Sequence, residues 1–485
     1  MKKRWEKIKK IFGGQMDLTS PHLFRNLLVF TLPIVLLSLL QLVYTEADQL
    51  VVDYFGGGYK SFVAVSANGS LINLLIGFFL GISVGANVVI AKARGKNDKE
   101  RAEKALHSAI FLAIVSGVAS AIIGYFLSPQ LLKLMKVHED VIDKATIYLQ
   151  VYFIGLPFLM LFNFGSSILR ALGDSKRPLY ILIICGIANV GLNFLFVIPF
   201  KMDVLGVALA TIICEFFQAA LTIFFLWYNK KSFVRLSFKK IFHLHGVEIR
   251  DILFAGIPAG VQSLAFTLSN TFIQTSVNSF GLTTTAGNSA AQQAEAFVYM
   301  IMNGFSVAVV SITAQNYGAK NIQNVKRILW YSLGTVTVLG LIVGGLFTLL
   351  RDPIISIFLS ERSVSNPEEL AAAKDVGMSR LTLICMTYFL CGIMDSEAAY
   401  CRGLGHSTIP TIITIFGASL LRILFIQTLF RYVEYFHSVE WIWVTWTGSW
   451  LVTSAMYWLV IPRYRKEAVA SIQRAAMTPE TSMSD

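Results

Sequence analysis

The sequence predicts an all-α membrane protein: twelve transmembrane helices in two six-helix bundles related by a pseudo-two-fold axis along the membrane normal. Three observations support this fold class. Hydrophobic residues make up 55% of the 485 residues and charged residues only 14%, whereas soluble proteins contain about 25% charged residues. The mean hydropathy is +0.62. Finally, apolar segments long enough to cross a bilayer recur along the chain, and its two halves repeat each other.

Twelve apolar segments have the length of about 20 residues that a membrane-crossing helix needs. Six fall in each half of the chain. Because six is an even number, both halves enter the membrane from the same side, which is the parallel-repeat arrangement. The segments cover residues 26–52, 61–90, 105–127, 146–169, 178–200, 205–228, 250–280, 286–313, 328–350, 379–400, 410–433 and 439–461.

The repeat is visible as paired motifs that follow the same order in both halves. The first pair begins with Pro33 and Pro258, which are 225 residues apart, and ends with Phe-Gly at the same separation. Two further pairs are AKARG (91–95) with AQNYG (314–318), and RALGDSKRP (170–178) with RGLGHSTIP (402–410). Three ordered matches indicate a duplicated chain.

The net charge of +12 fits the basic cytoplasmic loops of a membrane protein better than a nucleic-acid partner. With both termini in the cytoplasm, the cytoplasmic regions hold about 30 of the 41 Lys and Arg residues. The expected organisation is a basic cytoplasmic N-terminus (1–25), an N-terminal lobe (26–228), a cytoplasmic linker (229–249), a C-terminal lobe (250–461) and a cytoplasmic tail (462–485). The compact loops are typical of a bacterial inner-membrane protein.

The loop at residues 229–250 is basic, with interleaved Phe and Leu residues. We expect it to lie on anionic lipid headgroups. All five cysteines fall in apolar segments, where they are expected to pack as small core residues and neither form disulfides nor bind metal.

The first apolar segment contains a carboxylate, Asp48. A charged group in hydrocarbon costs roughly 2.5–3.5 kcal/mol or more, so such residues usually serve a function. Gln41, Tyr44 and Thr45 share one helical face with Asp48. This stripe therefore faces other protein or a water-filled cavity, while Glu46 lies about 200° away around the helix.

Several motifs resemble those of the multidrug and toxic compound extrusion (MATE) family, in its bacterial DinF-like branch. They are YTEADQLVV (44–52), LGISVGANVVIAKARGKND (80–98), RALGDSKRP (170–178), IPAGVQS (257–263), AQNYGAKN (314–321) and RGLGHSTIP (402–410). The similarity covers residues from about 20 to 460. It implies a V-shaped pair of six-helix bundles that export drugs, often cationic ones, in exchange for H⁺ or Na⁺.

The resemblance also implies an ion-coupling site in the N-terminal half. The residues that match it are Asp48, Tyr44, Asn163, Asn189 and Thr211. Asn193 stands where a common version of the motif has an acid, so the site loses a charge. Since Na⁺ prefers several oxygen ligands with negative charge, this departure favours H⁺.

Sodium remains the alternative coupling ion, with Asp48, Asn189 and Thr211 as ligands. Glu215, one helical turn after Thr211, could restore the missing charge from a neighbouring helix. No cofactor and no other metal is expected.

The second half carries the charged residues Glu295, Asp395, Glu397 and Arg422 inside its apolar segments. Two interpretations are open. Glu295, Asp395 and Arg422 could line a substrate cavity together with the polar residues Gln41 and Gln262. Alternatively, Arg422 could form a structural pair with Asp395 or Glu295.

The predicted function is secondary export of organic compounds by alternating access. The alternative is a lipid-linked oligosaccharide or metabolite flippase of the same superfamily. The apolar segments offer six acids against Arg422 as the one arginine, which favours cationic substrates. Catalytic motifs such as HExxH and GxSxG do not occur, so we expect no enzyme. The expected partners are small organic molecules and the bilayer, with no nucleic acid, and the protein is expected to be a monomer.

Overall fold

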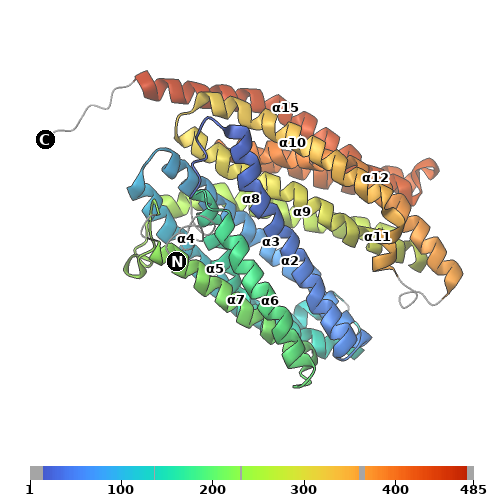
Figure 1. The fold of residues 1–485 in the computed structure, drawn as a ribbon. Coiled ribbons are helices and arrows are strands. Elements are labelled where there is room, and N and C mark those ends of the chain that lie inside the picture. The colour runs from blue at the N-terminus through green and yellow to red at the C-terminus, as the bar shows by residue number, and fades with distance from the viewer. Residues whose placement is uncertain (1–14, 136, 230–231, 360–365, 478–485) are drawn as a thin grey trace, which may run out of the picture. The chain divides into compact units, whose positions relative to one another are not determined.

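The computed structural model describes residues 15–135, 137–229, 232–359 and 366–477 (Figure 1). These residues form helices and no strands, as the sequence predicts. The first half contains α2 (Leu23–Phe55), α3 (Tyr59–Gly95), α4 (Lys99–Leu134), α5 (Glu139–Ala171), α6 (Lys176–Val197), α7 (Asp203–Tyr228) and the short η1 (Phe238–Lys240). The second half contains α8 (Gly246–Asn278), α9 (Leu282–Gly318), α10 (Ile322–Leu349), α11 (Arg351–Phe358), α12 (Pro367–Gly403), α13 (Thr408–Thr414), η2 (Ile415–Leu420), α14 (Leu421–Phe425), η3 (Ile426–Phe430), η4 (Glu434–Phe436) and α15 (Val439–Met477).

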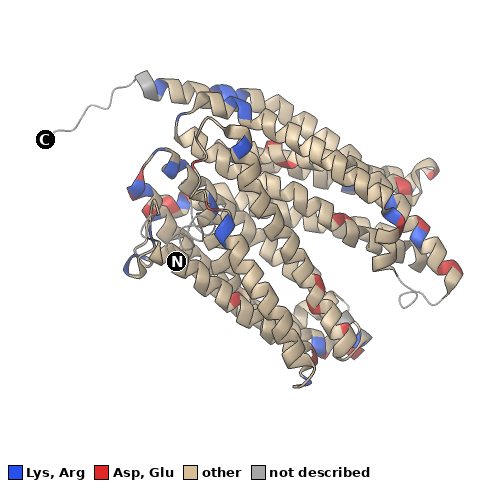
Figure 2. Cartoon of the chain, viewed as in Figure 1, with Lys and Arg blue, Asp and Glu red and all other residues tan. Residues whose placement is uncertain are grey.

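Eleven helices in the described part of the chain are long and apolar enough to cross a membrane. One of them is the continuous run of residues 408–430, from α13 to η3. The predicted twelfth segment is also helical, as part of α15. Its many Trp, Thr and Ser residues make it less apolar than the others. Figure 2 shows that charged residues gather near the ends of the helices and leave most of their middle parts uncharged. The predicted fold class is confirmed.

The chain divides into two compact units. Unit 1 takes in the described residues up to 17 and those between 32 and 260, and unit 2 takes in residues 18–31 and the described residues from 261 onward. The borders therefore fall inside α2 and α8, close to Pro33 and Pro258. Proline has no backbone N–H, so each long helix changes unit where it lacks a main-chain hydrogen bond.

The paired motifs of the two halves form the same turns. Gly173, with a φ of +73°, follows α5, and Gly405, with a φ of +100°, follows α12. In both turns the glycine N–H donates to the carbonyl of the arginine three residues earlier, Arg170 or Arg402. Glycine accepts this left-handed conformation without strain. The duplication seen in the sequence therefore extends to the geometry of the helix ends.

Close packing in unit 1 depends on small residues in α3. A methyl group added at Gly81 would lie 2.1 Å from the backbone nitrogen of Gly260, and one at Gly85 would lie 2.1 Å from the carbonyl oxygen of Ile252. Both contacts are to the backbone of α8, which cannot move aside as a side chain can. Gly69, earlier in the same helix, faces open space.

We predict that Gly81→Ala destabilises unit 1 by about 1–3 kcal/mol, because the added methyl group overpacks α3 against α8. Gly69→Ala is the matched control and should stabilise the protein by about 0.5–1 kcal/mol through helix propensity. Thermal unfolding of the detergent-solubilised protein measures both. Equal melting temperatures for the two variants would contradict this packing.

Candidate functional site

A buried polar cluster in unit 1 surrounds Asp48 of α2, whose exposed fraction is 5%. One carboxylate oxygen of Asp48 accepts a hydrogen bond of 2.6 Å from the side-chain amide of Asn193 on α6. The other lies 3.1 Å from the hydroxyl of Thr211 on α7. Three helices thus converge on one carboxyl group, and two neutral groups are its hydrogen-bond partners.

The amide of Asn193 also donates to the side-chain oxygen of Asn189, at 2.9 Å. Both asparagines are fully buried and lie one turn apart on α6. At position 193, where a common version of the family motif has an acid, this chain therefore has an amide that bonds to two neighbours. The amide supplies a hydrogen-bond donor to Asp48, where a second carboxylate would repel it.

The Thr211 hydroxyl has two possible acceptors and only one hydrogen. Its oxygen lies 3.0 Å from the carbonyl of Val207 and 3.1 Å from Asp48. If the hydroxyl donates to Val207, a protonated Asp48 can donate to the hydroxyl oxygen in turn. If Asp48 is ionised, the hydroxyl can donate to the carboxylate. The same geometry therefore accommodates both protonation states of Asp48.

Glu215 is a second buried carboxyl group near Asp48, one turn after Thr211 on α7. Tyr44, Asp48 and Glu215 are close enough to interact electrostatically. Glu215 packs against α5, because a methyl group at Gly155 would lie 2.5 Å from its carboxylate. Polar atoms of the cluster that are buried without a hydrogen-bond partner among the described residues are Tyr44 Oη, Asn189 Nδ2, Asn193 Oδ1 and Glu215 Oε2.

The remaining predicted residues of this site form no hydrogen bond with Asp48 among the described residues. Tyr44 packs beside Gly186 of α6. Asn163 is buried on α5, but no hydrogen bond joins it to Asp48 in the part of the chain that the structure describes. Sequence reasoning missed Tyr148 and Tyr152 of α5, which pack in the same core cluster as Val51 and Val52 of α2.

Asp48 and Glu215 have no buried basic partner among the described residues of unit 1, because the buried Lys and Arg residues all belong to unit 2. No group of three or more His, Cys, Asp or Glu residues in the described ranges could hold a metal ion. A buried carboxylate must be neutralised or paired. For Asp48 and Glu215, a proton or a bound cation could supply the missing positive charge.

Unit 2 contains a different kind of buried cluster. Glu295 of α9 forms an ion pair with Arg380 of α12, whose exposed fraction is 1%. Arg380 also donates to the side-chain oxygen of Asn288 at 2.7 Å, and Trp443 of α15 donates to the same oxygen at 3.2 Å. Here a buried cation pairs with the buried carboxylate.

The alternative interpretation, a pairing of Arg422 with Asp395 or Glu295, is wrong. Arg422 donates to the hydroxyl of Ser449 at 2.8 Å. Its guanidinium group lies over the rings of Trp446 and Trp450, with distances to the ring centroids of 5.4 and 5.9 Å. Aromatic faces attract a buried cation, so these tryptophans take the place that a carboxylate was expected to fill.

The other polar residues considered in the second half have hydrogen-bond partners outside the Glu295–Arg380 ion pair. Gln262 accepts a hydrogen bond of 2.6 Å from Arg402. The backbone carbonyl of half-buried Asp395 accepts one of 3.2 Å from Ser306. Glu397, which is fully buried, accepts one from Ser454 at 2.8 Å.

These contacts correct the count of buried charges. The sequence argument counted one arginine in the apolar segments, whereas Arg380, Arg402 and Arg422 are all buried in unit 2. The excess of acids that favoured cationic substrates is therefore confined to unit 1. Gln41, the last of the predicted cavity residues, is half-buried on α2, and its carbonyl accepts a hydrogen bond from Thr45.

The sequence profile of the MatE family matches residues 33–195 and 258–427, more than half of the chain. The chain belongs to the MatE family. The family assignment agrees with the resemblance seen in the motifs, and with eleven described helices that could span a membrane. It identifies the chain as a multi-pass membrane transporter.

Individual relatives of this MatE protein cover most of its length. It is 27% identical over 82% of its chain to the "Probable multidrug resistance protein YoeA" of Bacillus subtilis (strain 168), of which 85% is covered. It is 30% identical over 64% of its chain to the "Probable multidrug resistance protein YpnP" of the same organism, of which 68% is covered. A solved structure described as MATE in the bent conformation shares its fold, with a TM-score of 0.82 over 93% of this chain and 97% of that one, at 20% identity.

We predict that Glu295→Gln destabilises this MatE protein by about 3–5 kcal/mol, because Arg380 is then left buried without a counter-charge. The double variant Glu295→Leu with Arg380→Leu should lose much less stability, since it removes both charges together. Thermal unfolding in detergent measures the difference. If the double variant were less stable than Glu295→Gln, the pair would not be the dominant interaction here.

Proposed function

We propose that this protein exports organic compounds, including cationic ones, in exchange for protons, and that Asp48 is the group that binds and releases the coupling proton. The observation that carries this proposal is the Asp48 cluster. A buried carboxyl group has only uncharged hydrogen-bond partners, and Thr211 can adjust to either of its protonation states. The names of the relatives YoeA and YpnP support the multidrug part of the proposal.

The coupling follows from linkage. Proton and drug must prefer different states of the same carrier, so that binding of one promotes release of the other. Protonation removes the negative charge of Asp48 and with it the attraction for a cation. Inward proton flow can then drive outward movement of the organic compound.

The proposal includes an orientation and an assembly state. Both termini and the basic linker at 229–249 lie in the cytoplasm of a bacterial inner membrane, because most Lys and Arg residues then face inward. Gln41, Gln262, Glu295, Asp395 and Arg422 are proposed as polar residues near the substrate path. The transporter is proposed to act as a monomer without a cofactor.

A second candidate is export of an anionic metabolite or of a lipid-linked sugar. The observation in its favour is Arg422, which has aromatic and hydroxyl partners but no carboxylate among the described residues. Such a cation could attract a phosphate or carboxylate group. It is the weaker candidate because the carboxyl groups of unit 1 would repel the same substrate.

We predict that Asp48→Asn abolishes dye movement driven by a pH gradient, because the amide cannot carry the proton. The assay uses proteoliposomes and the fluorescent organic cation ethidium, with either a pH gradient or a Na⁺ gradient imposed. Asp53→Asn, the same substitution on the same helix, is the matched control and should retain transport. Gradient-driven transport that survives Asp48→Asn would refute the role of Asp48. Transport by the wild type only under a Na⁺ gradient would refute the proton assignment.

We predict that Asn193→Asp creates a sodium-binding site. Two carboxylates that close together cannot both be ionised without a cation between them. Addition of Na⁺, compared with the same concentration of K⁺, should therefore raise the melting temperature of Asn193→Asp and leave that of the wild type unchanged. Stabilisation of the wild type by Na⁺ would favour sodium as the natural coupling ion, with Glu215 as a further ligand.

A further inference from the structure

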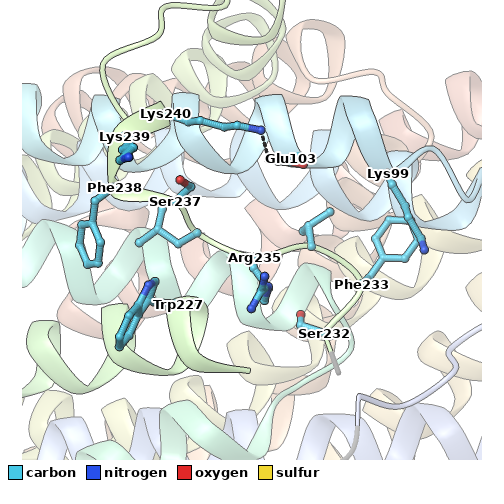
Figure 3. A pocket seen from close by; sticks show the side chains of 12 residues that line it. Lys99, Glu103, Trp227, Ser232, Phe233, Arg235, Ser237, Phe238, Lys239 and Lys240 are labelled. Atoms are coloured by element: carbon cyan, nitrogen blue, oxygen red, sulfur yellow. Dashed lines mark hydrogen bonds and ion pairs between the residues drawn. The ribbon is translucent and has the colours of Figure 1, made fainter. Parts of the chain in front are cut away.

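A pocket of about 660 Å³ lies in unit 1, away from the Asp48 cluster. Figure 3 shows the side chains that line it. They come from the first turns of α4, the last turn of α7 and residues 232–240 of the linker. Neither the proposed transport mechanism nor the family assignment gives this pocket a role.

The linker is held in a defined conformation at the pocket. The backbone N–H of Ser237 donates to the ring of His107 at 2.9 Å, and that of Leu236 donates to the carbonyl of Leu226 at 3.0 Å. Val234 and Leu236 are buried, while Arg235 between them is exposed. This alternation, typical of an extended segment, turns Arg235 away from the core. Figure 3 shows its guanidinium group between Trp227 and Phe233.

The pocket carries a surplus of positive charge. Its lining includes four cations, Lys99, Arg235, Lys239 and Lys240, against one carboxylate, Glu103. Lys240 is neutralised by Glu103 at 2.7 Å. Within the described ranges, no ion pair involves Lys99, Arg235 or Lys239, so three cations remain available for an anion.

One wall of the pocket is aromatic and exposed. Trp227, at the end of the membrane-crossing helix α7, is 47% exposed and lies 6.1 Å from the ring of Phe238, between centroids. Phe242, just beyond the pocket, is also exposed. Tryptophan at the end of a membrane helix is typical of the depth of the lipid headgroups. The pocket thus combines cations with apolar surface at that depth.

We propose that this pocket binds the phosphate group of an anionic phospholipid. Arg235 and Lys239 contact the phosphate, since a guanidinium group can form paired hydrogen bonds with two phosphate oxygens. Trp227 and Phe238 pack against the glycerol and upper acyl carbons. A soluble phosphate ester has the same charged group but would leave the aromatic wall exposed. We therefore favour a phospholipid over a soluble ester as the molecule that carries the phosphate group.

The proposal is tested with purified protein in nanodiscs made of phosphatidylcholine alone or with one fifth phosphatidylglycerol carrying brominated acyl chains. Bromine quenches nearby tryptophan fluorescence, and the part of the quenching lost in Trp227→Phe reports on the pocket. The double variant Arg235→Gln with Lys239→Gln should lower the apparent affinity for the anionic lipid. The apparent affinity should fall about twenty-fold or more, because each of the two basic residues contributes a factor of about five.

The matched control is Lys326→Gln with Arg327→Gln, which removes one exposed lysine and one exposed arginine from α10 in unit 2. It should leave the Trp227-dependent quenching unchanged. An equal loss in both double variants would show diffuse attraction and overturn the proposal, as would no loss in either. Competition by glycerol 1-phosphate at millimolar concentration would identify a soluble phosphate site and overturn the lipid source. Both double variants should elute from gel filtration and melt as the wild type does, which confirms that they fold.

Discussion

The cost of burying a carboxyl group in a membrane-spanning bundle governs the interior of both units. The two units meet this cost with different chemistry. Asp48 in unit 1 has an amide and a hydroxyl as partners, and both are neutral. Glu295 in unit 2 has a buried arginine. Neutral partners leave the charge of Asp48 uncompensated, so its protonation state can respond to the surroundings. The ion pair with Arg380 stabilises the ionised form of Glu295, so this carboxylate is less ready to change its protonation state. The Glu295–Arg380 pair is therefore better explained as structural.

The duplicated chain has therefore kept its helices and changed its polar chemistry. The turns at Gly173 and Gly405 are alike in conformation and hydrogen bonding. In contrast, the position that corresponds to Asp48 in the second half, 225 residues later, is the buried aliphatic residue Ile273. Turns and helix packing fix the fold, and they tolerate few residue types. Interior polar residues are free to differ if only one half carries the coupling site, as proposed here for the first half.

Much of the fold and the centre of the site could be predicted from the sequence, because hydropathy and a lone acid in an apolar segment are local signals. The role of Arg380 could not. Helix α12 begins at Pro367, twelve residues before the predicted segment at 379–400, and its polar first turns give no hydropathy signal. Arg380 therefore looked like a residue at the edge of a span. The tryptophans around Arg422 are on another helix, α15, so no spacing within one segment reveals them.

The distribution of buried charge determines where a proton and a cationic substrate can compete. In unit 2, the buried arginines Arg380, Arg402 and Arg422 accompany the buried acids Glu295 and Glu397 and the half-buried Asp395. Unit 1 buries Asp48 and Glu215 without a buried Lys or Arg among its described residues. Any attraction of the interior for cations must then come from unit 1. In the proposed mechanism, the Asp48 carboxyl group is also the proton acceptor, so its protonation would weaken the binding of a cation. In that proposed mechanism, competition of proton and cation for the charge of Asp48 is sufficient for antiport.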